Sequence, residues 1–271
     1  MTEIARYRGE TCETVQDWVT EEVALEIRIN GAPFAITMRT PGDDFALVAG
    51  LLFAEEIIAG RDDVRAMGYG TEESDPERKN LVQVELSQAA REYVRKERYL
   101  PISASCGVCG KASLAGLGSS LTPLPPDSIA FSPALLYSLP PKLRAVQEVF
   151  QRTGGLHAAG LFDHDGNLLA LKEDVGRHNA VDKVIGGKVM EGAVPLSNRI
   201  LLVSGRVSFE IVQKAARAQI PVLCAVSAPS SLAVAMAQTI GMTLVGFLRG
   251  DGMNVYADAK RVFANAETKR A

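Results

Sequence analysis

Strands and helices alternate along the second half of the chain, and this pattern limits the fold more than any other feature. The run 200–204 is apolar apart from its final serine, as expected of a strand buried on both faces. Apolar residues then recur at helical spacing over 209–217, and the pattern continues as strand 221–226, helix 230–239 and strand 243–248. Upstream it predicts strands 156–162 and 168–171 and helix 178–190. Such alternation is typical of a layered α/β sheet.

The first half of the chain has a β-rich pattern. Residues 23–29 alternate apolar and polar, and the tight-turn sequence Asn30-Gly31 joins them to a partner strand at 33–38. The pattern then predicts a helix over 43–58, strands at 64–69 and 81–86, and a charged, solvated run at 88–98. Residues 1–21 are polar, and we expect them to be loosely held.

Glycines and prolines separate the two halves. The sequence Pro123-Leu124-Pro125-Pro126 is typical of a linker, so we expect a boundary near residue 125 and two portions, 1–125 and 126–271. Beyond it, Ser132-Pro133 favours a helix start. We expect Pro140-Pro141 to interrupt this helix and Gly154-Gly155 to end it.

Composition excludes several classes of protein. The net charge of −3 lacks the basic excess of a nucleic-acid-binding protein, and no apolar run reaches membrane-spanning length. The first residues lack a signal peptide's apolar centre, so we expect a cytoplasmic protein without a membrane partner. Four cysteines in 271 residues do not make a disulfide scaffold, and Cys224 lies in an apolar run as a core residue would.

Two of the cysteines, Cys106 and Cys109, form a Cys-x-x-Cys sequence flanked by glycines. Thiols at this spacing can close a short disulfide, share a metal, act as nucleophile and helper, or simply be small buried residues in a turn. The thiolate is the reactive form, and a helix N-terminus or a nearby cation lowers the thiol pKa. A helix beginning near residue 112 and the cation Lys111 would favour the reactive interpretation.

Polar turns follow three of the predicted strands. Asp174, Arg177 and His178 follow strand 168–171, and Arg206 follows the strand at 200–204. The serine-rich turn 227–231 follows the third strand. Ligands of α/β sheets bind where strands end, and a helix N-terminus beside an arginine suits an anion. Each turn alone could be a helix cap, and for the two serine-rich turns that interpretation is equally good, but together the three favour an anion-binding surface.

A fourth candidate segment follows the last apolar strand. Its residues are Phe247, Leu248, Arg249, Gly250, Asp251 and Gly252. The glycines allow close approach of the backbone to a ligand and Arg249 supplies charge, although an ordinary surface turn has the same composition. The chain has no Gly-x-x-x-x-Gly-Lys pattern, so this is not a P-loop.

His157 is the remaining candidate, and a lone histidine on a strand is more often an interior residue than a ligand. Zinc deaminases use His-x-Glu followed by Cys-x-x-Cys, whereas here the cysteines come first and Ala159 occupies the glutamate position. Zinc held by Cys106, Cys109 and two histidines is possible in principle, but the wide separation disfavours it. We therefore expect no metal of the protein's own.

Three motifs in order give the chain a family resemblance. Cys-Gly-Val-Cys-Gly-Lys at 106–111, Glu-Asp-Val-Gly-Arg-His-Asn-Ala at 173–180 and Ser-Gly-Arg at 204–206 resemble the formate dehydrogenase accessory sulfurtransferases, often called FdhD. The resemblance covers about residues 22–256. It implies a cytidine-deaminase-like layered α/β core with an additional β-rich N-terminal portion, generally as a homodimer.

The resemblance also implies an activity. Such proteins accept sulfur from a cysteine desulfurase as a persulfide on the Cys-x-x-Cys loop. They pass it to the molybdenum or tungsten bis-molybdopterin guanine dinucleotide cofactor that formate dehydrogenase, the client, requires. By motif position Cys106 is the persulfide carrier, Cys109 its partner, and 247–252 the cofactor-binding segment. Charge and placement add Arg177, His178 and Arg206 to the cofactor site.

Two other classes of function remain open on the sequence. A dithiol oxidoreductase would use Cys106 and Cys109 as a reversible disulfide and would need no nucleotide site. A non-catalytic carrier or chaperone of the molybdenum cofactor would bind guanine nucleotide even without both cysteines. The sulfurtransferase needs both features together.

Overall fold

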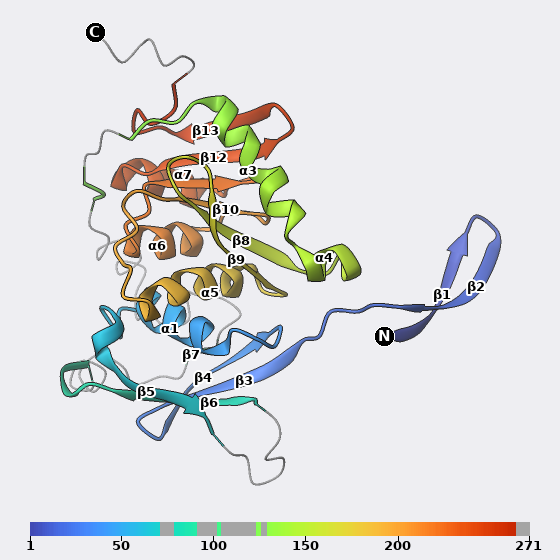
Figure 1. Ribbon diagram of the computed structural model, residues 1–271, viewed down its shortest axis with the longest axis horizontal. Coiled ribbons are helices and arrows are strands. Elements are labelled where there is room, and N and C mark those ends of the chain that lie inside the picture. The colour runs from blue at the N-terminus through green and yellow to red at the C-terminus, as the bar shows by residue number, and fades with distance from the viewer. Residues whose placement is uncertain (71–78, 91–101, 104–122, 126–128, 264–271) are drawn as a thin grey trace.

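The computed structural model describes residues 1–70, 79–90, 102–103, 123–125 and 129–263. Its main element is a six-stranded sheet in the order β13-β12-β11-β10-β8-β9 (Figure 1). The strands are β8 (His157–Phe162), β9 (Leu168–Asp174), β10 (Ile200–Val203), β11 (Val222–Ala225), β12 (Thr243–Arg249) and β13 (Gly252–Ala257).

Strand direction decides where this sheet can bind a ligand. β10, β11 and β12 are parallel, while β8 is antiparallel to both β9 and β10. The carboxyl ends of β9, β10, β11 and β12 therefore meet at one edge, together with the start of β8. We call this the carboxyl edge.

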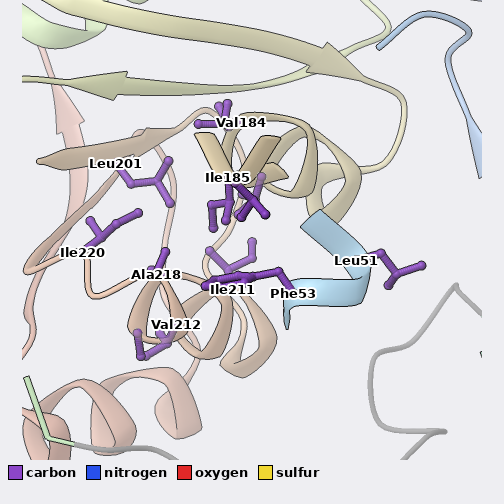
Figure 2. Close-up of a cluster of buried hydrophobic side chains, with 14 of the residues drawn as sticks. Leu51, Phe53, Val184, Ile185, Leu201, Ile211, Val212, Ala218 and Ile220 are labelled. Atoms are coloured by element: carbon purple, nitrogen blue, oxygen red, sulfur yellow. The ribbon is translucent and has the colours of Figure 1, made fainter. Parts of the chain in front are cut away.

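Helices cover both faces of the sheet. α3 (Pro133–Ala145), followed by α4 (Glu148–Thr153), covers one face. α5 (Arg177–Met190), α6 (Phe209–Arg217) and α7 (Ser231–Ile240) cover the other. β10 shows why: Leu201 and Val203 belong to the core on the α5–α6 side, Ile200 and Leu202 to the core beneath α3. Figure 2 shows Leu201 of β10 and Ile185 of α5 in one cluster of buried side chains.

A second sheet lies beyond α5, in the order β5-β6-β3-β4-β7. Its strands are β3 (Val23–Ile29), β4 (Ala32–Arg39), β5 (Val64–Tyr69), β6 (Leu81–Leu86) and β7 (Ile102–Ser103), with the short 3-10 helix η1 (Arg61–Asp63) before β5. Helix α1 (Asp44–Ala54) lies between this sheet and α5 (Figure 1). The mixed α/β class with an additional β-rich N-terminal portion is therefore confirmed.

Buried side chains from both halves of the chain form one core cluster, which includes Leu25, Leu52, Val184 and Leu201. The division into 1–125 and 126–271 stays a prediction, as does the likeness to cytidine deaminases. Among the described residues, no helix combines the length and apolar character needed to cross a membrane.

Two glycines allow α1 and α5 to pack closely against each other. A Cβ on Gly186 would overlap the carbonyl oxygen of Ala46, and one on Gly50 the carbonyl of Asp182. Both obstacles are backbone atoms, which cannot move without separating the helices.

We expect Gly186→Ala to destabilise the protein by about 1–3 kcal/mol, because the two backbones must separate. Gly187→Ala is the matched control, since nothing lies within 4 Å of a Cβ there. Alanine favours a helix over glycine by up to about 1 kcal/mol, so this variant should be as stable as the wild type or more so. Urea unfolding measures both, and equal stability of the two variants would contradict the close-packing account.

The structure corrects the predictions for two polar or proline-containing segments. Residues 1–21 are not loosely held throughout: β1 (Thr2–Arg8) and β2 (Thr11–Asp17) pair as a hairpin that projects from the body (Figure 1). Gly9, at φ 61°, supplies the positive φ of its tight turn. Pro140-Pro141 do not interrupt α3, which runs through them because Leu136, Leu139 and Leu143 stay buried on one helical face.

Two further boundaries differ. The helix predicted over 43–58 ends at Ala54, and Glu56 has a φ of 61°, which a continuing helix does not allow. β13 follows the predicted turn and was not expected: Gly250 reverses the chain, and 252–257 pair with β12 at the edge of the sheet.

Candidate functional site

The carboxyl edge gathers the predicted polar residues of the second half. Arg177 and His178 open α5 directly after β9, and Arg206 lies in the turn after β10. Arg249 ends β12, and His157 opens β8 at the same edge. The sequence expectation that these strand ends lie together is thus met by the topology, which also adds His157.

A cavity of about 700 Å³ opens beside this edge, on the α3 side. Its wall comes from α3, α4, the segment before β8 and the strand ends: Pro140, Pro141, Leu143, Arg144, Gln147, Phe150, Gly154, Gly155, Leu156, His157, Ser204, Val226, Arg249 and Gly250. The volume lies within the range of small-molecule sites. Mostly apolar walls with two arginines suit a ligand that has both a flat apolar part and negative charge.

Segment 247–252 contributes unequally to this cavity. Arg249 and Gly250 line it, and the Arg249 guanidinium lies 5.6 Å from the ring centre of Phe247. The side chain of Leu248 is fully buried in the core beneath α3, so only its backbone can face a ligand. Asp251 and Gly252 lead from the turn into β13.

Arg177 has an unused donor. Its Nε is buried, and no described residue accepts a hydrogen bond from it. Burial lowers the pKa of His157, and the charges of Arg177 and Arg206 lower it further. His157 is therefore neutral at pH 7, and the two arginines beside it leave positive potential at the edge. An anionic group would satisfy this arrangement.

His178 is neutral as well. Burial, followed by the charges of Arg177 and Lys214, lowers its pKa to about 4, and the Glu210 carboxylate opposes this shift. Its Nε2 lies 2.9 Å from Ser208 Oγ and 3.8 Å from Glu210 Oε2. The longer separation joins a neutral ring to a carboxylate, so we interpret it as a contact and not as an ion pair.

This low pKa predicts acid sensitivity. The folded pKa of about 4 lies below the ordinary 6.5, so the unfolded chain binds the proton more readily between these values. Stability should therefore fall as pH drops from 6.5 to 4, by up to about 3 kcal/mol from this group. His178→Gln should remove that slope in urea unfolding at several pH values, while exposed His164→Gln should keep it. Identical slopes in all three proteins would contradict the assignment.

A buried network fixes the turn that carries Arg177 and His178. Asp174 is fully buried and accepts hydrogen bonds from the backbone N–H of Gly176 at 2.8 Å and of Thr40 at 3.2 Å. Lys183 Nζ lies 2.8 Å from the Asp174 carboxylate and donates to the Thr40 carbonyl at 2.8 Å. The start of α5 is thereby tied to the end of β4 in the N-terminal sheet.

Cys106 and Cys109 lie outside the described residues. The nearest described strand is β7, where Ile102 and Ser103 pair with Ala35 and Ile36 of β4. Within the described part of the chain, no group of three or more His, Cys, Asp or Glu side chains could hold a metal ion.

Sequence reasoning missed part of this edge. Arg144, Gln147 and Phe150 line the cavity only because α3 and α4 fold over the strand ends, and no local motif announces that. Ser208 and Glu210 were not among the residues predicted from the sequence. A serine at the N-cap of α6 with a glutamate in the first turn was the available signal.

Fold and cavity together define the class: a mixed α/β protein with a cavity and several arginines at the carboxyl edge of its main sheet. The sequence profile described as the FdhD/NarQ family matches residues 20–263. The chain therefore belongs to the FdhD/NarQ family, as the motifs indicated.

Similar proteins agree with this membership. A Streptomyces coelicolor protein named sulfur carrier protein FdhD is 50% identical, covering 97% of this chain and 95% of its own. A Mycobacterium tuberculosis protein of the same name is 50% identical, covering 89% and 90%. A crystal structure described as a formate dehydrogenase accessory protein from Desulfotalea psychrophila superimposes with a TM-score of 0.76 at 25% identity, covering 97% and 98%.

Proposed function

We propose that this chain is a sulfurtransferase that serves formate dehydrogenase. Persulfide sulfur from a cysteine desulfurase is accepted at Cys106, with Cys109 as its partner, and passed to the molybdenum or tungsten bis-molybdopterin guanine dinucleotide cofactor. The observation that carries this proposal is the 50% identity, over 97% of the chain, to a protein named as a sulfur carrier.

The loading step is a thiol exchange. The Cys106 thiolate attacks the terminal sulfur of the donor's persulfide, a new S–S bond forms, and the donor cysteine leaves as a thiolate. No net oxidation or reduction occurs. Of the two cysteines outside this motif, buried Cys224 has its pKa raised by burial to about 12, so it does not supply a thiolate.

The cofactor is the substrate in this proposal, and the residues at the carboxyl edge fit it. Its pyrophosphate groups match the cationic side chains of Arg177, Arg206 and Arg249, of which Arg177 has a buried unused donor. The cavity lined by Arg249 and Gly250 has room for a nucleotide-sized arm. When bound, the cofactor supplies the metal that receives sulfur, while this chain binds and orients it.

We also propose that the chain works in the cytoplasm as a homodimer. The β1–β2 hairpin supports a second copy as a partner, since Tyr7 is 71% and the adjoining Trp18 50% exposed. A lone two-stranded hairpin is marginally stable in water, so contact with another chain would stabilise it.

The cofactor role predicts a loss of function at Arg249. Arg249→Ala should lower formate dehydrogenase maturation at least tenfold while sulfur loading stays unchanged, because only binding of the anionic cargo depends on this charge. Exposed Arg65→Ala on β5 is the matched control and should behave as the wild type. Wild-type maturation with Arg249→Ala would contradict cofactor binding at this edge. If the wild type and both variants bind guanine nucleotide but none accepts sulfur, the result would favour the alternative function of a non-catalytic cofactor carrier.

A further inference from the structure

A hydrogen-bonded network of three side chains lies at the starts of α5 and α6. It runs from His178 through Ser208 to Glu210. Burial raises the pKa of Glu210, but hydrogen bonds from the Ser208 hydroxyl and from its own backbone N–H outweigh burial and hold it low. Glu210 is therefore a carboxylate, which only accepts hydrogen bonds. The Ser208 proton is directed at it.

The donor and acceptor roles in this network fix the tautomer of His178. Because Ser208 donates to Glu210, its oxygen must accept in its contact with His178 Nε2, 2.9 Å away. The neutral imidazole has one N–H, so that proton is on Nε2 and the Nδ1 carries a lone pair. Ser208 and Glu210 thus select one of two tautomers.

No described residue hydrogen-bonds to the Nδ1 atom of His178. The His178 side chain is 20% exposed, so the ring is open to a ligand, and Nδ1 accepts a hydrogen bond without offering a positive charge. The groups around the ring are Arg177 on α5, Glu210 and Lys214 on α6, and His157 on β8. Of these, Lys214 is already paired with Asp182 at 2.7 Å.

We propose that Ser208 and Glu210 are positioning residues that hold His178 as a fixed hydrogen-bond acceptor for a heterocyclic N–H of the ligand. This deepens the proposed function and rests on it, because guanine and pterin rings both carry such donors. The two kinds of residue bind different parts of the ligand: the arginines bind its phosphate groups, and His178 binds one of its rings. A phosphate oxygen, which has no N–H, gains nothing from Nδ1.

The tautomer can be measured directly, since the chain has only three histidines. Long-range ¹H–¹⁵N NMR at pH 7 should show His178 protonated at Nε2 alone. Ser208→Ala should give a mixture of both tautomers, because the hydrogen-bond acceptor at Nε2 is lost and the nearest remaining one, Glu210 Oε2, is 3.8 Å away. Ser132→Ala, which replaces the N-cap serine of α3, is the control and should leave the His178 signals unchanged. Protonation at Nδ1 in the wild type would overturn the proposal.

Ligand binding separates recognition of a ring from recognition of phosphate. Calorimetric titration would compare GDP, neopterin and pyrophosphate on the wild type, Ser208→Ala and Glu210→Gln. We expect both variants to bind GDP, neopterin or both about tenfold more weakly and pyrophosphate within twofold, as loss of one aligned hydrogen bond predicts. The affected ligand tells which ring meets His178. Equal losses for all three ligands, or none, would overturn the proposal.

The two proposals fail differently. If the wild type binds none of the three ligands, the cofactor role and the ring contact are both wrong, whatever the tautomer. If the wild type binds GDP and carries sulfur but the variants bind every ligand normally, only the role of Ser208 and Glu210 is wrong.

Discussion

Replacing Cys106 with alanine should abolish sulfur transfer to formate dehydrogenase, with activity falling by at least a hundredfold. Alanine has no sulfur, and the thiolate is the competent nucleophile in persulfide exchange. Formate dehydrogenase activity after maturation with each purified variant measures the effect. Thermal unfolding of each variant, expected at the wild-type temperature, checks that the loss does not come from misfolding.

The other cysteines provide matched controls. Exposed Cys12→Ala on β2 should retain full activity, since that thiol is exposed but lies on the projecting hairpin. Cys109→Ala should reduce transfer while leaving sulfur loading at Cys106 intact. Full activity of Cys106→Ala would contradict the assignment of the carrier thiol, and loss in Cys12→Ala alone would move it to the hairpin.

Removing the amine of Lys183 should cost about 3–5 kcal/mol of folding free energy. Lys183 is 1% and Asp174 0% exposed, so Lys183→Met leaves a buried carboxylate without its counter-charge. The network that ties Thr40 to the start of α5 then weakens, and the carboxyl edge should lose ligand affinity as well. Urea unfolding and GDP titration measure the two effects.

Lys172 makes the appropriate comparison. It also pairs with an aspartate near the end of β4, Asp43, at 2.6 Å, but both side chains are partly exposed. Exposed ion pairs contribute about 0–1 kcal/mol, so Lys172→Met should be nearly neutral. Similar losses of unfolding free energy in the two variants would contradict the claim that burial makes the Lys183–Asp174 pair more important for stability than an exposed pair.

Much of the fold was predictable because its strands and helices carry strong local signals. The apolar runs that became β10, β11 and β12 have few alternatives to a buried strand, and Asn30-Gly31 forms the expected turn. The β1–β2 hairpin was not predicted, because few of its side chains are buried and its sequence therefore has no apolar periodicity. α3 passed through Pro140-Pro141 because tertiary packing outweighed a local helix-breaking signal.

The candidate site was predictable only where its residues lie close to a strand with a strong local signal. The rule that ligands bind at strand ends led to Arg177, Arg206 and Arg249, since each lies at or within a few residues of the end of a strand. The cavity wall was not predictable, because Arg144 and Phe150 reach it only through the packing of α3 and α4. Contacts such as Thr40 N to Asp174, 134 residues apart in sequence, leave no local pattern.

The most direct test of sulfur transfer is intact-mass analysis after incubation with a cysteine desulfurase and cysteine. The wild type and each single cysteine variant would be compared with and without reductant. We predict a reductant-labile gain of one sulfur atom in the wild type, Cys12→Ala and Cys109→Ala, and no gain in Cys106→Ala. Absence of sulfur from the wild type, or an undiminished gain in Cys106→Ala, would contradict the account.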